Sequence, residues 1–192
     1  MINIKKFSIF LYILFATGCY TATPPLINVL SLSDYWGTHI GQVGTGAEVM
    51  IMPKGTYASK APQSLSVNFG VYQTFFPKSA DCSVLVSNPR YNYITIRFIE
   101  LPNGKFDMNK VYITKNGKIY HLQSIKSPSN FSDISAEVTP VRTNSYFWYK
   151  VPVFCGSLED AVFEMSGIYS NGKELPPIKF RINLLNQAGI KS

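Results

Sequence analysis

Apolar and polar side chains alternate in short runs along most of the chain. In YNYITIRF, residues 91–98, the two isoleucines and Phe98 fall on one face of an extended chain, and the tyrosines, Thr95 and Arg97 fall on the other. A period of two is that of a half-buried β-strand. Similar runs cover residues 48–52, 64–76, 82–87, 133–138 and 145–154. They predict about eight to ten strands, and no long helical period follows the first 18 residues.

Turn signals separate several of these runs. Asn-Gly occurs at residues 103–104, 116–117 and 171–172, each time followed by lysine. Asn-Gly tolerates the positive φ values of type I′ turns, whose twist matches that of paired strands. The turn at Asn116-Gly117 is the clearest, because VYIT precedes it and IYHL follows it.

Two segments near the C-terminus are ambiguous by pattern alone. SLEDAVFEM, residues 157–165, has a cap and an acidic first turn that suit a helix, and it suits a turn followed by a strand equally. We favour the turn and strand. Pro176 and Pro177 place the start of the last strand at a sheet edge or a bend.

Many strands with turns between them predict an all-β fold, an antiparallel β-sandwich. The layout resembles immunoglobulin-like sandwiches in architecture alone. Trp148 precedes Cys155 closely instead of lying midway between two cysteines as in antibody domains. No specific domain family is recognised in these residues.

The first residues have the layout of a secretory signal peptide. Lys5 and Lys6 precede an uncharged, mostly apolar run from Phe7 to Gly18, which ends in small residues. This run of 12 residues is shorter than the roughly 20 that a membrane-spanning helix needs. The sequence therefore predicts export without a permanent transmembrane helix.

Ala16-Thr17-Gly18-Cys19 resembles the lipobox of bacterial lipoproteins, although Ala16 stands where leucine is usual. The resemblance covers residues 1–20 and implies cleavage before Cys19 and acylation, palmitate included, of that cysteine. Tyr20 follows in place of aspartate, which resembles the outer-membrane class, with a domain facing the periplasm or the exterior. The alternatives are ordinary cleavage after Gly18 or Ala22, and an uncut chain with a buried Cys19.

We expect a signal peptide over residues 1–18, an acylated Cys19 with a tether over 19–33, and one β-sandwich domain over 34–192. Thr21 to Pro25 disfavours a helix, whereas Leu26–Leu32 is apolar enough to be the first strand. Removing 18 of 192 residues leaves 174, enough for one domain with a substantial core.

The formal net charge of the full chain is +7. Lys5 and Lys6 leave with the signal peptide, so 16 basic residues face 11 acidic ones and the net charge becomes +5. The remaining basic residues are scattered singly. Scattered positive charge favours solubility and attraction to anionic envelope surfaces, and nucleic acid is not an expected partner.

The three cysteines form an odd set until Cys19 is set aside for acylation. Cys82 and Cys155 are then the pair available for a disulfide in an oxidising compartment. Each shares a strand face with apolar neighbours, so both sulfur atoms are predicted to point inward. Closing this loop would stabilise the fold by about 4 kcal/mol on the chain-entropy model. The alternative is two separate buried thiols.

Residues for catalysis or metal binding are few. His39 and His121 lack cysteine, histidine or aspartate at ligand spacing, so no metal and no cofactor is expected. The glycines at 41, 44 and 46 precede a strand pattern, which favours a loop or hairpin over a phosphate site. The carboxylates that could serve a hydrolase acting on polysaccharide or peptidoglycan, the alternative function, are Glu100, Asp107 and Glu137, and nothing in the pattern brings them together. We therefore expect a protein that is not an enzyme.

Aromatic residues make up 14% of the chain, more than a core requires. If the polar faces of two strand segments lie outward on neighbouring strands, they form a flat aromatic and basic surface for a glycan or another envelope protein. The alternative is that a second layer or the chain's own loops cover these side chains. The predicted binding residues are Tyr91, Tyr93 and Arg97 on one segment and Tyr146, Trp148 and Lys150 on the other.

Overall fold

The computed structural model describes residues 27–43, 46–69, 93–127, 129–135, 137–151, 158 and 160–184, and these residues form antiparallel sheets of the kind found in β-sandwiches. A short 3₁₀ helix, Ala58–Lys60, is the exception to the strands in this part of the chain. The strands are β1 Ile27–Ser31, β2 Trp36–Val43, β3 Gly46–Pro53, β4 Ser64–Phe69, β5 Tyr93–Glu100, β6 Gly104–Asp107, β7 Val111–Lys115, β8 Lys118–His121, β9 Gln123–Ser127, β10 Asn130–Asp133, β11 Val138–Val141, β12 Ser145–Lys150, β13 Val162–Met165, β14 Ile168–Ser170, β15 Lys173–Glu174 and β16 Ile178–Leu184.

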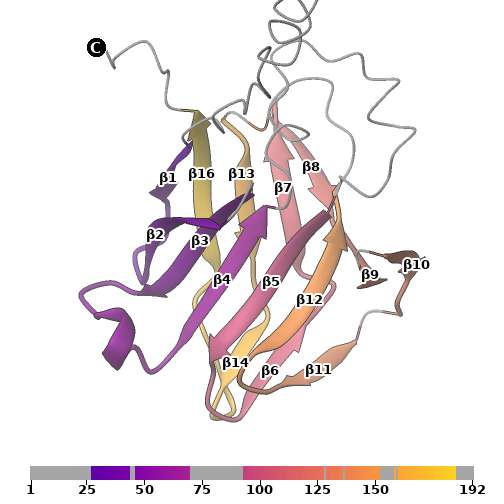
Figure 1. Ribbon diagram of the computed structural model, residues 1–192. Coiled ribbons are helices and arrows are strands. Elements are labelled where there is room, and N and C mark those ends of the chain that lie inside the picture. Colours follow the sequence, from indigo (N-terminus) through magenta and orange to yellow (C-terminus); the bar gives the residue numbers. More distant parts are fainter. Residues whose placement is uncertain are drawn as a thin grey trace, which may run out of the picture.

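Two large sheets form the layers of the sandwich (Figure 1). The seven-stranded sheet has the order β10-β9-β12-β5-β4-β3-β2, and the five-stranded sheet has the order β1-β16-β13-β7-β8. The chain passes between them from β1 to β2 and again from β8 to β9. A single buried residue, Leu122, separates β8 from β9, so the second passage is tight.

A four-stranded sheet, β11-β6-β14-β15, continues the five-stranded sheet at one end of the sandwich (Figure 1). β6 leads into β7 and β13 leads into β14. The Asp107 backbone N–H donates to the Gly167 carbonyl at 2.9 Å, and the Ser166 N–H donates to the Lys110 carbonyl at 3.0 Å. These bonds join the β6-to-β7 connection to the β13-to-β14 connection, where the four-stranded and five-stranded sheets meet.

The core lies between the layers and is strongly aromatic. Phe69 of the seven-stranded sheet meets Phe163 and Phe180 of the five-stranded sheet edge to face, with centroids 6.4 and 6.3 Å away. Such pairs are favoured by the ring quadrupole in addition to the area that they bury. Trp36 is also buried, and its indole N–H donates to the Pro176 carbonyl at 2.7 Å.

The Asn-Gly turns are of two kinds. Asn116 and Gly117 both have positive φ, as do Asn171 and Gly172, and each pair joins two antiparallel strands as a type I′ turn does. At Pro102-Asn103-Gly104 the prediction of a type I′ turn is wrong, because Asn103 alone has positive φ. The Gly104 N–H donates to the Leu101 carbonyl at 3.0 Å, and this arrangement is that of a type II turn with proline at its second position.

The structure tests three further strand predictions, over residues 157–165, after Pro177 and over residues 133–138. In SLEDAVFEM, a turn at Asp160 precedes β13, in agreement with the favoured prediction. β16 begins directly after Pro177 and lies between β1 and β13, so it is not an edge strand. The predicted strand over residues 133–138 is wrong, because β10 ends at Asp133 and β11 begins at Val138.

Tyr149 joins the two layers by a buried hydrogen bond. Its hydroxyl donates to the Met108 carbonyl at 3.2 Å. Burial raises the pKa of this hydroxyl far above its ordinary value, and the carboxylate of Asp107 adds to the shift. The neutral phenol is therefore the form that the folded protein holds.

Alkaline pH should therefore destabilise the protein through Tyr149. An unfolded tyrosine loses its proton near pH 10, whereas folded Tyr149 keeps it, so its stabilisation is complete below about pH 10 and is lost as the pH rises further. Tyr149→Phe should be less stable than wild type by about 1 kcal/mol at pH 7. In urea titrations this difference should shrink above about pH 10, and an equal difference at both pH values would contradict the assignment.

Candidate functional site

β5 and β12 carry the predicted binding residues. On β5, Ile94, Ile96 and Phe98 are fully buried in the core, and the alternate residues Tyr93, Thr95 and Arg97 point away from it. On β12, Tyr149 is buried, and Tyr146, Trp148 and Lys150 alternate with it. The alternation in the sequence therefore assigned the inner and outer faces of both strands correctly.

The two strands are direct neighbours, and their register places these residues side by side. Arg97 lies opposite Tyr146, Thr95 opposite Trp148, and Tyr93 opposite Lys150. Residues that lie directly opposite in an antiparallel pair share a face of the sheet. We call Tyr93, Arg97, Tyr146, Trp148 and Lys150 the aromatic–basic face.

Four other predicted residues lie outside the described part of the chain. They are Tyr91, the sixth predicted binding residue, Cys19, and the predicted disulfide partners Cys82 and Cys155. The acylation and the disulfide therefore stay predictions.

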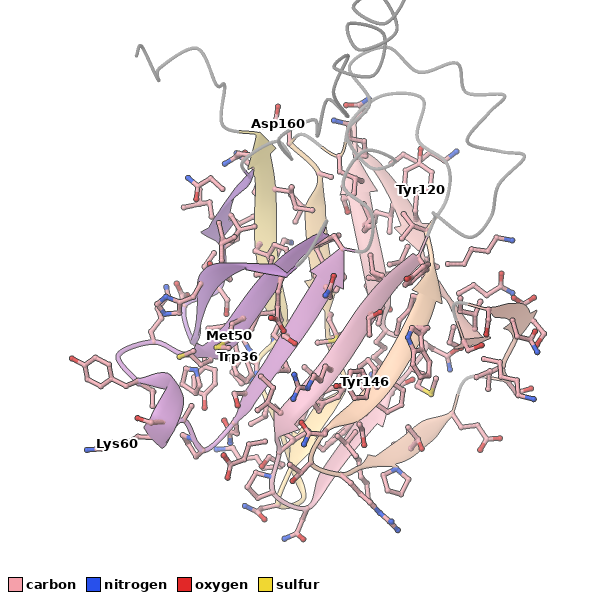
Figure 2. All side chains as sticks on the ribbon, in the orientation of Figure 1. Trp36, Met50, Lys60, Tyr120, Tyr146 and Asp160 are labelled. Carbon is pink, nitrogen blue, oxygen red and sulfur yellow. The ribbon has the colours of Figure 1, made fainter. Side chains whose placement is uncertain are left out.

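The aromatic–basic face has an ordered centre. The rings of Tyr146 and Trp148 are nearly parallel, with an interplanar angle of 14° and centroids 6.3 Å apart. This separation is close to the rise of about 6.6 Å over two residues of a strand, so both rings follow the strand in one orientation. Tyr146 is 46% exposed and lies on the outward side of the seven-stranded sheet (Figure 2).

The Arg97 guanidinium is held in place from two sides. Its Cζ atom lies 5.6 Å from the centroid of the Tyr146 ring, within the range of a cation–π contact. Its Nε and Nη2 atoms donate to the Asn144 side-chain oxygen at 3.2 and 2.8 Å. Asn144 is presented by the turn before β12, where its φ is 62°. The arginine is thus ordered before any ligand arrives.

Positive charge on this face is not neutralised by the described carboxylates. Two ion pairs of the described residues, Lys110 with Asp107 at 3.7 Å and Lys179 with Glu164 at 3.0 Å, lie outside the seven-stranded sheet. Arg97 and Lys150 belong to neither. Glu48 of β3 shares the outer face but lies two strands away from Thr95. The face is therefore basic where its aromatic rings are.

The structure adds a second part of this surface that the sequence did not reveal. One row of opposed residues crosses five strands, His39, Met50, Ser66, Arg97 and Tyr146. At its far end is a hollow of about 500 Å³ lined by His39, Met50, Met52, Gly55, Thr56 and Tyr57. The alternation in EVMIM signals outward methionines, but only the strand order shows that they share a surface with Tyr146.

The candidate catalytic residues are dispersed. His39 is on β2 and His121 on β8, in different sheets. The Asp107 carboxylate accepts the Asn109 backbone N–H at 3.1 Å and pairs with Lys110, so it is engaged in its own turn. Among the described residues no group of three or more His, Cys, Asp or Glu could hold a metal ion. The same residues include no helix long and apolar enough to cross a membrane.

A larger hollow, of about 840 Å³, lies at the end of the sandwich beside β15. It is open to solvent between Tyr35 and Gln63 on one side and Lys173 and Glu174 on the other. The Tyr35 hydroxyl donates to the Gln63 side-chain oxygen at 2.6 Å, so these two groups satisfy one another. The aromatic–basic face instead gathers aromatic rings and two cations that belong to neither ion pair named above, and we take it as the candidate site.

Comparison with known proteins adds no relative. No protein-family model matches the chain, and no curated protein or solved structure matches it.

Proposed function

We propose that the protein is a non-catalytic binding module of the bacterial cell envelope, held on the outer membrane by acyl chains at Cys19. Its binding surface is the aromatic–basic face, and its partner is an envelope protein or a glycan. The observation that carries the proposal is the register of β5 and β12, which gathers two clustered aromatic rings and the cations of Arg97 and Lys150 on one outward face. Large amphipathic rings beside Arg are the residues most enriched in binding hot spots.

The proposed anchor leaves this face open. Ile27, where β1 begins, is eight positions after Cys19, so the tether reaches about 28 Å at most. Ile27 is opposite Leu184, at the end of the sandwich where β16 finishes. The strands that carry the aromatic–basic face, β5 and β12, run along the side of the sandwich instead (Figure 1). A protein tethered by this end can meet a partner in the envelope with that side.

Truncating the rings should weaken binding strongly and spare the fold. We expect Trp148→Ala with Tyr93→Ala to weaken binding of the full chain to a solubilised envelope extract by about tenfold or more, because hot-spot aromatics carry most of an interface's energy. Binding is measured by biolayer interferometry with the protein immobilised. The thermal midpoint should fall by only a few degrees, because these side chains lie outside the core.

A matched control is available in the other sheet. Tyr120 of β8 carries the Lys118 amino group 5.1 Å from its ring centroid, as Tyr146 carries Arg97. Tyr120→Ala should leave binding to the envelope extract unchanged. Equal losses in the two variants, or a large drop in thermal midpoint for Trp148→Ala and Tyr93→Ala, would refute the proposed binding role.

A further inference from the structure

We propose that the ligand of the aromatic–basic face is an acidic polysaccharide, a chain of sugar rings that carry carboxylates. This inference rests on the proposed function and names the chemistry of its partner. Three features of the face support it: the arrangement of its rings, the presentation of its arginine and the polar residues on the β5 side of Trp148.

The rings suit sugars. One face of a pyranose ring carries C–H groups with partial positive charge, and the face of an aromatic ring is negative. Tyr146 and Trp148 share an orientation and have centroids 6.3 Å apart, a spacing on the scale of one sugar ring. Two successive sugar residues of an extended glycan can therefore contact the two aromatic rings without a bend in the glycan or a movement of the rings.

The arginine suits a carboxylate. Arginine has five N–H donors in a planar fork that matches a carboxylate, and Asn144 engages Nε and one N–H of Nη2. Within the described residues the remaining donors make no side-chain hydrogen bond, so they are available beside the Tyr146 ring. Because Asn144 and Tyr146 already hold the guanidinium, little side-chain freedom is lost when an anion binds. Lys150, exposed at the other side of Trp148, supplies a second cation along the same strand.

The side of Trp148 that faces β5 suits sugar hydroxyls. Between Trp148 and the edge of the sheet the same face presents Thr95, Asn68 and Glu48, which are half-buried and polar. On the other side of Trp148 the same row continues to Ile125 of β9, which is buried. The hydroxyl and amide groups on the β5 side are the partners that sugar hydroxyls need.

The test uses the purified full chain and three polymers of similar length. Polygalacturonate carries sugar rings and carboxylates, dextran carries sugar rings alone, and poly-L-glutamate carries carboxylates alone. We expect polygalacturonate to bind at least tenfold more tightly than either of the others in isothermal titration calorimetry. Trp148→Ala and Arg97→Gln should each reduce that affinity about tenfold, and Tyr120→Ala and Lys118→Gln should not. Equal affinity for poly-L-glutamate, or no binding of polygalacturonate, overturns the inference.

A parallel arm separates this inference from the proposed function. The envelope extract is treated with periodate, which oxidises sugar diols, or with proteinase K, and then offered to wild type and Trp148→Ala. Trp148-dependent binding that periodate abolishes and protease spares supports an acidic glycan. Trp148-dependent binding that protease abolishes and periodate spares overturns the glycan and leaves the binding module standing. Equal binding of wild type and Trp148→Ala in every arm overturns both the acidic glycan and the proposed binding module.

Discussion

Replacing Phe163 with alanine should lower the free energy of unfolding by about 3–5 kcal/mol, the range for a buried Phe→Ala change. Phe163 has no exposed surface, and its ring stacks on Phe180 with centroids 5.0 Å apart and an interplanar angle of 26°. It also meets the edge of Phe69 from the other sheet. The substitution therefore leaves a cavity where the two layers meet. Urea unfolding followed by circular dichroism measures the loss.

Ile119→Ala is the control for this experiment. Ile119 lies on β8 and is 62% exposed, so its removal should change stability by no more than about 0.5 kcal/mol. If Phe163→Ala costs as little as Ile119→Ala, the aromatic cluster does not hold the layers together.

Gly167→Ala should destabilise the protein by about 2–4 kcal/mol, from a left-handed backbone and a steric clash together. Gly167 joins β13 to β14 and has φ +67°, which side chains rarely adopt. A Cβ atom there would lie 2.7 Å from the Asp107 Cβ and 2.9 Å from the Lys110 Cδ. The backbone would have to move, and the hydrogen bond from the Asp107 N–H to the Gly167 carbonyl would weaken. Thermal unfolding by calorimetry measures the effect.

Gly117→Ala separates the two causes. Gly117 has φ +73°, but a Cβ atom there would meet nothing within 4 Å. The backbone conformation alone should cost about 1 kcal/mol at this turn. A Gly167→Ala loss no larger than the Gly117→Ala loss would show that the junction tolerates a side chain.

The strands of the candidate site were predictable because each strand's alternation is a local property. Side chains point to opposite faces in turn, so Ile94 and Ile96 in the core require Tyr93, Thr95 and Arg97 to face away. The same reasoning oriented Tyr146, Trp148 and Lys150. The type I′ turn at Asn116-Gly117 was predictable for a similar reason, because it depends on two adjacent residues.

Predictions were wrong where residues outside the local pattern determine the backbone conformation. Alternation over residues 133–138 suggested one strand, but Asp133 pairs with Ile125 of β9 and Val138 pairs with Asp107 of β6. The chain turns between these two sheets, so no single strand can form. At Asn103-Gly104, the preceding Pro102 and a close approach to Leu101 select the other turn type.

The sequence by itself determined which side chains of β5 and β12 point away from the core. Only the tertiary structure decided that these strands are neighbours, that Arg97 lies opposite Tyr146, and that Met50 and the hollow beside Tyr57 share their surface. The reason is physical. A strand's faces are set by its own backbone geometry, whereas its partner and register are set by which pairing buries the apolar faces of both layers at once.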